Sequence, residues 1–143
     1  MEGLVEELTR GNVTEVKVVL ASVVAALAVH QLVLIAVGYG KLRPPFLGAR
    51  PASAAHRASG DTIVVLVVVV ATMCVSYFGF ETDDGATFHV LAAIALLAAL
   101  TLKVAVVRWW HGMGRFLPLI GGLVFVLIGL TWASSAGDFL AGS

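Results

Sequence analysis

The chain has 143 residues, of which 59% are hydrophobic and only 13% are charged, whereas a soluble domain carries roughly a quarter charged residues. This composition argues against a water-soluble domain. The nine basic and nine acidic side chains cancel, which argues against a nucleic-acid partner, because a phosphate-binding surface needs a basic excess. A chain of this length fits one domain, residues 1–143.

Four apolar segments are long enough to cross a membrane. A spanning helix needs about 20 mostly apolar residues at a rise of about 1.5 Å each, and segments 18–37, 62–80, 88–107 and 117–136 meet this requirement. The valine-rich run 63–70 would favour a strand in water, but in lipid the backbone must satisfy its own hydrogen bonds within a helix. The sequence therefore predicts an all-α integral membrane protein, built as an antiparallel four-helix bundle.

Local signals support these boundaries. Asn12 and Glu15 have the spacing of a capping box before the first segment. Prolines in the connection 38–61 exclude a helix from its first half. The Asp-Asp-Gly sequence at 83–85 predicts a tight turn, and Pro118 falls in the first turn of the fourth helix, where its missing N–H costs little.

Charge is distributed unequally between the two sides of the predicted bundle. Seven basic residues fall on the side reached after the first and third segments, opposed there by Asp61: Lys41, Arg43, Arg50, Arg57, Lys103, Arg108 and Arg115. The other side has two basic residues, Arg10 and Lys17, against eight acidic ones: Glu2, Glu6, Glu7, Glu15, Glu81, Asp83, Asp84 and Asp138. The positive-inside rule places the basic side in the cytoplasm, so both termini are expected outside.

Histidines are the candidate cofactor ligands. His30 lies within the first segment, His56 precedes the second, His89 opens the third at the outer surface, and His111 follows the third. Imidazole is a common axial ligand of haem, and membrane helix bundles can hold haem. The hypothesis is that the bundle binds haem b, with His56 and His89 as candidate iron ligands. The alternative is that His56, His89 and His111 are solvated or interfacial end residues and that His30 is a packed residue of the bundle interior.

Depth in the membrane restricts the pairs that could hold one iron. His56 and His89 lie on opposite membrane faces and cannot share it. His89 could pair with the thioether of Met73, and His56 could pair with His30 or His111. On the predicted spans His30 and His56 differ in depth by roughly 20 Å, so this pair requires a second helix that begins deeper than its apolar run. The chain lacks two histidines spaced on one helix, the mark of a stacked dihaem bundle.

Lys103 is an unusual residue because it lies inside the third predicted span. The favoured interpretation is that its long side chain extends to the cytoplasmic interface. The functional alternative is a counter-charge for a haem propionate or an anionic lipid head group. Met73 and Cys74 in the second segment fit ordinary packing residues.

Several of these residues together resemble a known family. The chain resembles small bacterial four-span membrane proteins. The resemblance rests on the run His56-Arg57-Ala58-Ser59-Gly60, followed by His89, Lys103, Leu117-Pro118, Gly121-Gly122 and Thr131-Trp132. The resemblance covers about residues 55–140 and implies a b-type-cytochrome-like domain in the bacterial plasma membrane. Such relatives often place a histidine in the outer half of the second span, where this chain has Met73-Cys74.

The leading functional prediction is an electron-transfer subunit that binds haem b within a four-helix membrane bundle. Its candidate cofactor-binding residues are His56, His89, His30, Met73 and Lys103. The expected partners are the lipid bilayer and other membrane or redox subunits, with no nucleic acid. The second prediction is a structural or accessory subunit without haem. A channel or transporter fits less well, because the spans carry almost no polar pathway.

Overall fold

The computed structural model describes residues 3, 6–7, 9–79 and 84–142, and every regular element within these ranges is helical. In chain order the elements are α2 (Val13–Gly38), α3 (Ala49–Tyr77), α4 (Asp84–Arg108), the 3₁₀-helix η1 (His111–Phe116), α5 (Leu117–Trp132), the π-helix η2 (Ala133–Gly137) and α6 (Asp138–Gly142). Four stretches are long and apolar enough to cross a membrane: Val13–Gly38, Ala49–Phe78, Ala86–Arg108 and His111–Gly142. The all-helical part of the fold prediction is confirmed.

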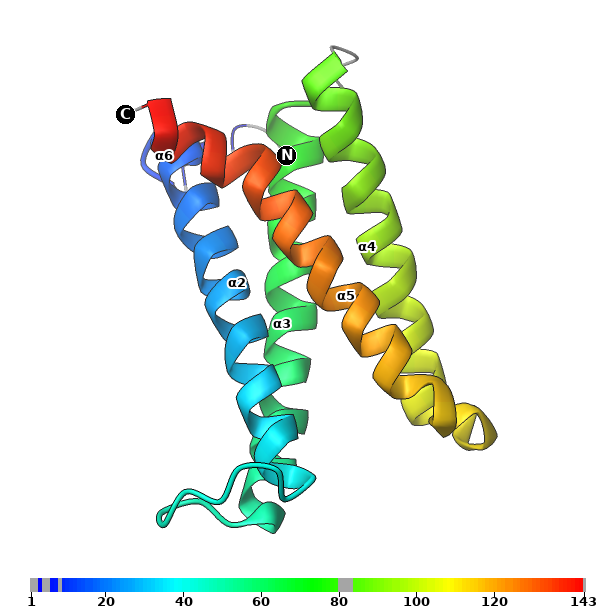
Figure 1. Ribbon diagram of the computed structural model, residues 1–143. Helices are drawn as coiled ribbons and strands as arrows, with labels where there is room; N and C mark the ends of the chain where they lie inside the picture. The colour runs from blue at the N-terminus through cyan, green and yellow to red at the C-terminus, as the bar shows by residue number, and fades with distance from the viewer. Residues whose placement is uncertain (1–2, 4–5, 8, 80–83, 143) are drawn as a thin grey trace.

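The long helices share one apolar core (Figure 1). α2 packs most closely on α3, and α4 on α5, while α2 also packs on α5 and joins the two pairs. All four helices contribute buried aliphatic side chains to this core: Val24, Ala28, Ile63, Val67, Leu96, Ala99, Leu100, Val106, Ile120, Val124 and Ile128. α3 and α4 have little contact with each other. α2 begins and α6 ends at the same end of the molecule.

Two smaller clusters extend the α2–α3 contact toward its ends. Val13 and Met73 are buried together near the start of α2 and the end of α3. At the opposite end, Leu34 and Val37 of α2 pack on Ala52, which is fully buried near the start of α3. Ala52 precedes the apolar run of α3. Packing on α2 therefore stabilises the first turns of α3, which a hydropathy profile does not predict to be part of a membrane-spanning helix.

The helix boundaries differ from the predicted ones mainly in α3, which begins at Ala49 rather than at residue 62. The alanine-rich sequence before the apolar run is a good helix former, and Pro51 falls in the first turn, where proline is tolerated. The absence of helix from the first half of the connection is confirmed, because residues 39–48 are irregular. Pro118 lies at the start of α5 as predicted.

Two local predictions are corrected. The Asn12 side chain makes no capping hydrogen bond, so the predicted capping box does not form, although the Asn12 carbonyl accepts the N–H of Val16 at 3.0 Å. Asp84 is the first residue of α4 rather than part of a turn, and Asp83 lies outside the described residues. The last residue of the predicted second span, Phe80, also lies outside them.

Candidate functional site

A polar cluster lies between α2 and α3 in the half of the molecule where the predicted basic side is found. Gln31 of α2 is only 8% exposed. Its Nε2 donates to the carbonyl oxygen of His56 at 2.9 Å and to the hydroxyl oxygen of Ser59 at 2.9 Å. The Ser59 hydroxyl in turn donates to the carbonyl oxygen of Ala55 at 2.7 Å. Gln31 therefore links the two helices through polar contacts at a level where their other contacts are apolar.

Two buried atoms of this cluster have no hydrogen-bond partner in the described part of the chain: Gln31 Oε1 and His56 Nδ1. A buried polar atom left unpaired costs about 1–3 kcal/mol. Lys103 of α4 is partly buried and lies within electrostatic range of His56. The cluster thus combines an unpaired acceptor, an unpaired imidazole nitrogen and a nearby cation.

This arrangement corrects the predicted position of His56. The residue lies inside α3, is partly buried and is level with Gln31, rather than preceding the helix. The predicted depth difference of roughly 20 Å between His30 and His56 is therefore wrong, because α3 begins three turns earlier than its apolar run. His30 nevertheless does not join the cluster, since its side chain is exposed on α2. The expectation that His30 faces the interior is also wrong.

Sequence reasoning missed Gln31, although a signal was present. A glutamine within an apolar span is as unusual as a histidine, since polar side chains in such spans face neighbouring helices. Gly60 is the second part of that signal. Gly60 faces Gln31, since a Cβ added at Gly60 would lie at the ordinary contact distance of 3.5 Å from Gln31 Nε2.

A second polar cluster surrounds His89 at the other end of the core. His89 Nδ1 lies 3.0 Å from the Ser134 hydroxyl oxygen, and the imidazole also interacts with the backbone of Thr131. The Ser134 hydroxyl donates to the Thr131 carbonyl at 3.3 Å. Which atom donates in the contact between His89 and Ser134 depends on the imidazole tautomer. In the tautomer with its hydrogen on Nδ1, the Ser134 oxygen accepts from His89 while the hydroxyl donates to Thr131. In this tautomer the Nε2 atom of His89 carries the lone pair of the ring, which is the form in which an imidazole binds metals.

The irregular end of the fourth span positions Ser134. α5 ends at Trp132 and continues as the π-helix η2, and such π-segments often occur at functional sites because they redirect side chains. Trp132 Nε1 donates to the Ser22 hydroxyl of α2 at 3.1 Å, which fixes this junction against α2. No feature of the sequence predicted the π-helix, which depends on these tertiary contacts.

Lys17 of α2 adds a positive charge near the cluster around His89. It lies within electrostatic range of His89, and its Nζ is 4.3 Å from the centre of the Phe78 ring. Each of the two partly buried histidines, His56 and His89, therefore has a lysine from another helix nearby.

The remaining predicted site residues lie apart from these clusters. Met73 is buried against Val13 of α2, whereas His89 faces the junction of α5 and η2. His111 is exposed at the start of η1. Within the described ranges, no group of three His, Cys, Asp or Glu side chains is placed to hold a metal ion. Neither predicted partner, Met73 for His89 or His111 for His56, is brought to its histidine by the contacts described above.

The fold and the two clusters define a small helical protein with four membrane-length helices and a histidine–lysine pair toward each end of its core. Residues 4–143 match a protein family described as "Family of unknown function (DUF6529)", and the chain belongs to this family. No curated protein and no solved structure matches the chain. The cytochrome-like function implied by the resemblance is not part of the family description.

Proposed function

We propose that the chain is an antiparallel four-helix subunit of a bacterial plasma membrane that binds haem b and transfers electrons. Both termini lie outside the cell in this proposal, because the basic residues gather at the opposite end of the helices. Partners are the bilayer and other redox subunits, since a single small bundle needs an electron donor and an acceptor.

The observation that carries the haem proposal is the hydrogen bonding of His89. Histidines that bind metals usually donate their other ring N–H to a fixed acceptor, which sets the tautomer and the ring orientation. The contact between His89 Nδ1 and Ser134 would have this form in the tautomer with its hydrogen on Nδ1, and Nε2 would then be the ligand atom. Lys17 provides a positive charge on the neighbouring helix that would balance a propionate.

In this proposal one imidazole at the outer end holds the haem. His89 would be the axial ligand, Ser134 would hold its orientation, and Lys17 would hold the negative edge of the group. Bound haem would supply one-electron transfer, which no side chain of the described residues provides. His56, with Lys103 nearby, offers the corresponding inner position, but its Nδ1 has no partner that fixes the ring.

A specific observation favours a second candidate, a structural or accessory subunit without haem. The shared core is filled by aliphatic side chains from all four helices. Many large apolar side chains remain exposed along these helices, among them Val19, Val65, Leu91 and Leu119. Such a chain could act by packing its apolar faces on larger membrane subunits.

The reduced-minus-oxidised optical spectrum of the purified protein distinguishes the two candidates. Wild type expressed with sufficient haem should show a b-type difference spectrum. His89→Ala should lose it, whereas the matched control His111→Ala, which changes an exposed histidine, should keep it. A wild-type protein without haem absorbance would leave the accessory role as the function. A spectrum unchanged in His89→Ala would remove His89 as the ligand.

A further inference from the structure

A hollow lies along the first turns of α3, where this helix extends past the end of α4. Arg108, the last residue of α4, lies 3.8 Å from Asp61. α3 continues from Asp61 back to Ala49, which corresponds to about 18 Å of helix. The hollow has a volume of about 700 Å³ and is lined by Ala49, Arg50, Ser53, Ala54, Arg57, Ala58 and Asp61.

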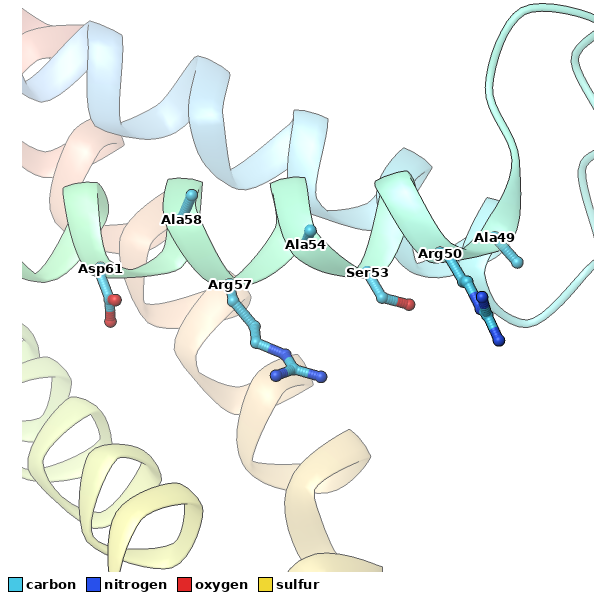
Figure 2. Close-up of a pocket in the computed structure, with 7 residues that line it drawn as sticks. All are labelled: Ala49, Arg50, Ser53, Ala54, Arg57, Ala58 and Asp61. Atoms are coloured by element: carbon cyan, nitrogen blue, oxygen red, sulfur yellow. The ribbon is translucent and has the colours of Figure 1, made fainter.

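The lining combines positive charge with small side chains (Figure 2). Arg50, Ser53 and Arg57 project to the same side of α3. Along the helix, Ala54 lies between Ser53 and Arg57, and Ala58 lies between Arg57 and Asp61. The Asp61 carboxylate pairs with Arg108. In the part of the chain that the structure describes, Arg50 and Arg57 have no carboxylate within ion-pair distance. The two guanidinium groups therefore lack an anionic partner.

The same face of α3 becomes apolar further along the helix. Residues 57, 61, 65 and 68 lie on one helical face because they are spaced by three or four positions. Val65 is 61% exposed and Val68 is 51% exposed. A surface with arginines at one end and exposed valines two to three turns away matches a molecule with an anionic head and an apolar tail.

We propose that this α3 face binds an anionic phospholipid, with its phosphate held by Arg50 and Arg57 and an acyl chain along Val65 and Val68. Guanidinium forms strong, charge-assisted hydrogen bonds with phosphate oxygens. Free phosphate would use the two arginines alone, whereas a lipid also covers the exposed valines. The proposal does not depend on haem, since neither arginine belongs to the two histidine clusters.

Native mass spectrometry of the detergent-solubilised protein titrated with phosphatidylglycerol or phosphatidylcholine tests this site. Wild type should bind phosphatidylglycerol preferentially. The double variant Arg50→Gln/Arg57→Gln should bind it at least about tenfold more weakly, because both charge-assisted contacts to the phosphate are lost. The matched control Arg43→Gln/Arg115→Gln removes the same charge from the same end of the molecule, outside the hollow, and should change binding less than twofold.

Three further outcomes are decisive. Equal losses in both double variants would show non-specific attraction to a basic surface and overturn the site. Displacement of the lipid by equimolar inorganic phosphate would show that the arginines recognise free phosphate instead. If the arginine variant is not folded, Ala58→Phe replaces it, because this change fills the exposed floor of the hollow and keeps both charges. Unchanged phosphatidylglycerol binding in a folded Ala58→Phe protein would also overturn the proposal.

Discussion

The hydrogen bonds of Gln31 predict an unexpected order of stability for two variants. Gln31→Met keeps a side chain of similar length and removes both contacts with α3, each worth about 0.6 kcal/mol between membrane helices. It also removes the unpaired Oε1, whose burial costs about 1–3 kcal/mol. We therefore expect Gln31→Met to be neutral or to stabilise the protein by up to about 2 kcal/mol.

Ser59→Ala should have the opposite effect although it removes a smaller group. It deletes one of the two contacts and leaves an N–H of the buried Gln31 amide without its acceptor. An unpaired buried donor costs about 1–3 kcal/mol, so Ser59→Ala should be the less stable variant. In a Gln31→Met background the same serine substitution should cost less than about 0.5 kcal/mol, because the donor is absent.

The free energy of unfolding in mixed micelles, measured by denaturant titration for wild type, both single variants and the double variant, checks this order. Gly60→Ala serves as a control, since its added Cβ would only reach ordinary contact with Gln31 at 3.5 Å. A loss of more than about 2 kcal/mol in Gln31→Met with a neutral Ser59→Ala would refute the reasoning. That result would mean that Oε1 has a partner worth more than the cost of its burial.

Three further predictions concern orientation and the two ends of the core. In a chain with Cys74 replaced by serine, an impermeant thiol reagent should label Asp84→Cys from outside the cell and should label Arg50→Cys only after lysis. The reverse labelling would show that the proposed orientation is inverted. If the Lys103 ammonium only extends to the interface, Lys103→Met should leave the stability of the protein unchanged or raise it by at most about 2 kcal/mol. A marked loss of stability and of cofactor would instead indicate a bound anion. Trp132→Phe should cost about 0.6–1.7 kcal/mol, because it removes the 3.1 Å bond to α2, and unchanged unfolding would show that this bond does not stabilise the helix junction.

The sequence predicted the four long helices well because hydropathy is a local property. Residues 18–37, 88–107 and 117–136 all fall within helical stretches, the last of them changing to a π-helix at Ala133. The predicted start of α3 was wrong because the first turns of this helix are held by the packing of Ala52 on α2, a contact between residues distant in sequence. The helix propensity of the alanine-rich residues after Ala49 could have predicted this start, but the boundary was drawn from hydropathy alone.

The candidate site was predictable only in part, for the same reason. His56 and His89 could be selected from the sequence as unusual residues near apolar spans, but their neighbours could not. Gln31 reaches His56 because α2 and α3 lie in a register that depends on where α3 begins. Ser134 reaches His89 only through the π-helix that follows Trp132. His30 was expected to face the interior but is exposed, because one helical position decides whether a side chain faces the core or the surface.

The haem content of the purified wild-type protein tests the central proposal most directly. Haem b is extracted and quantified as its pyridine complex against protein determined by amino-acid analysis, after expression with supplied haem. One ligating imidazole at the outer end predicts about one haem b per chain. A ratio close to zero in a folded, membrane-inserted protein would contradict the electron-transfer function and leave the chain as an accessory subunit.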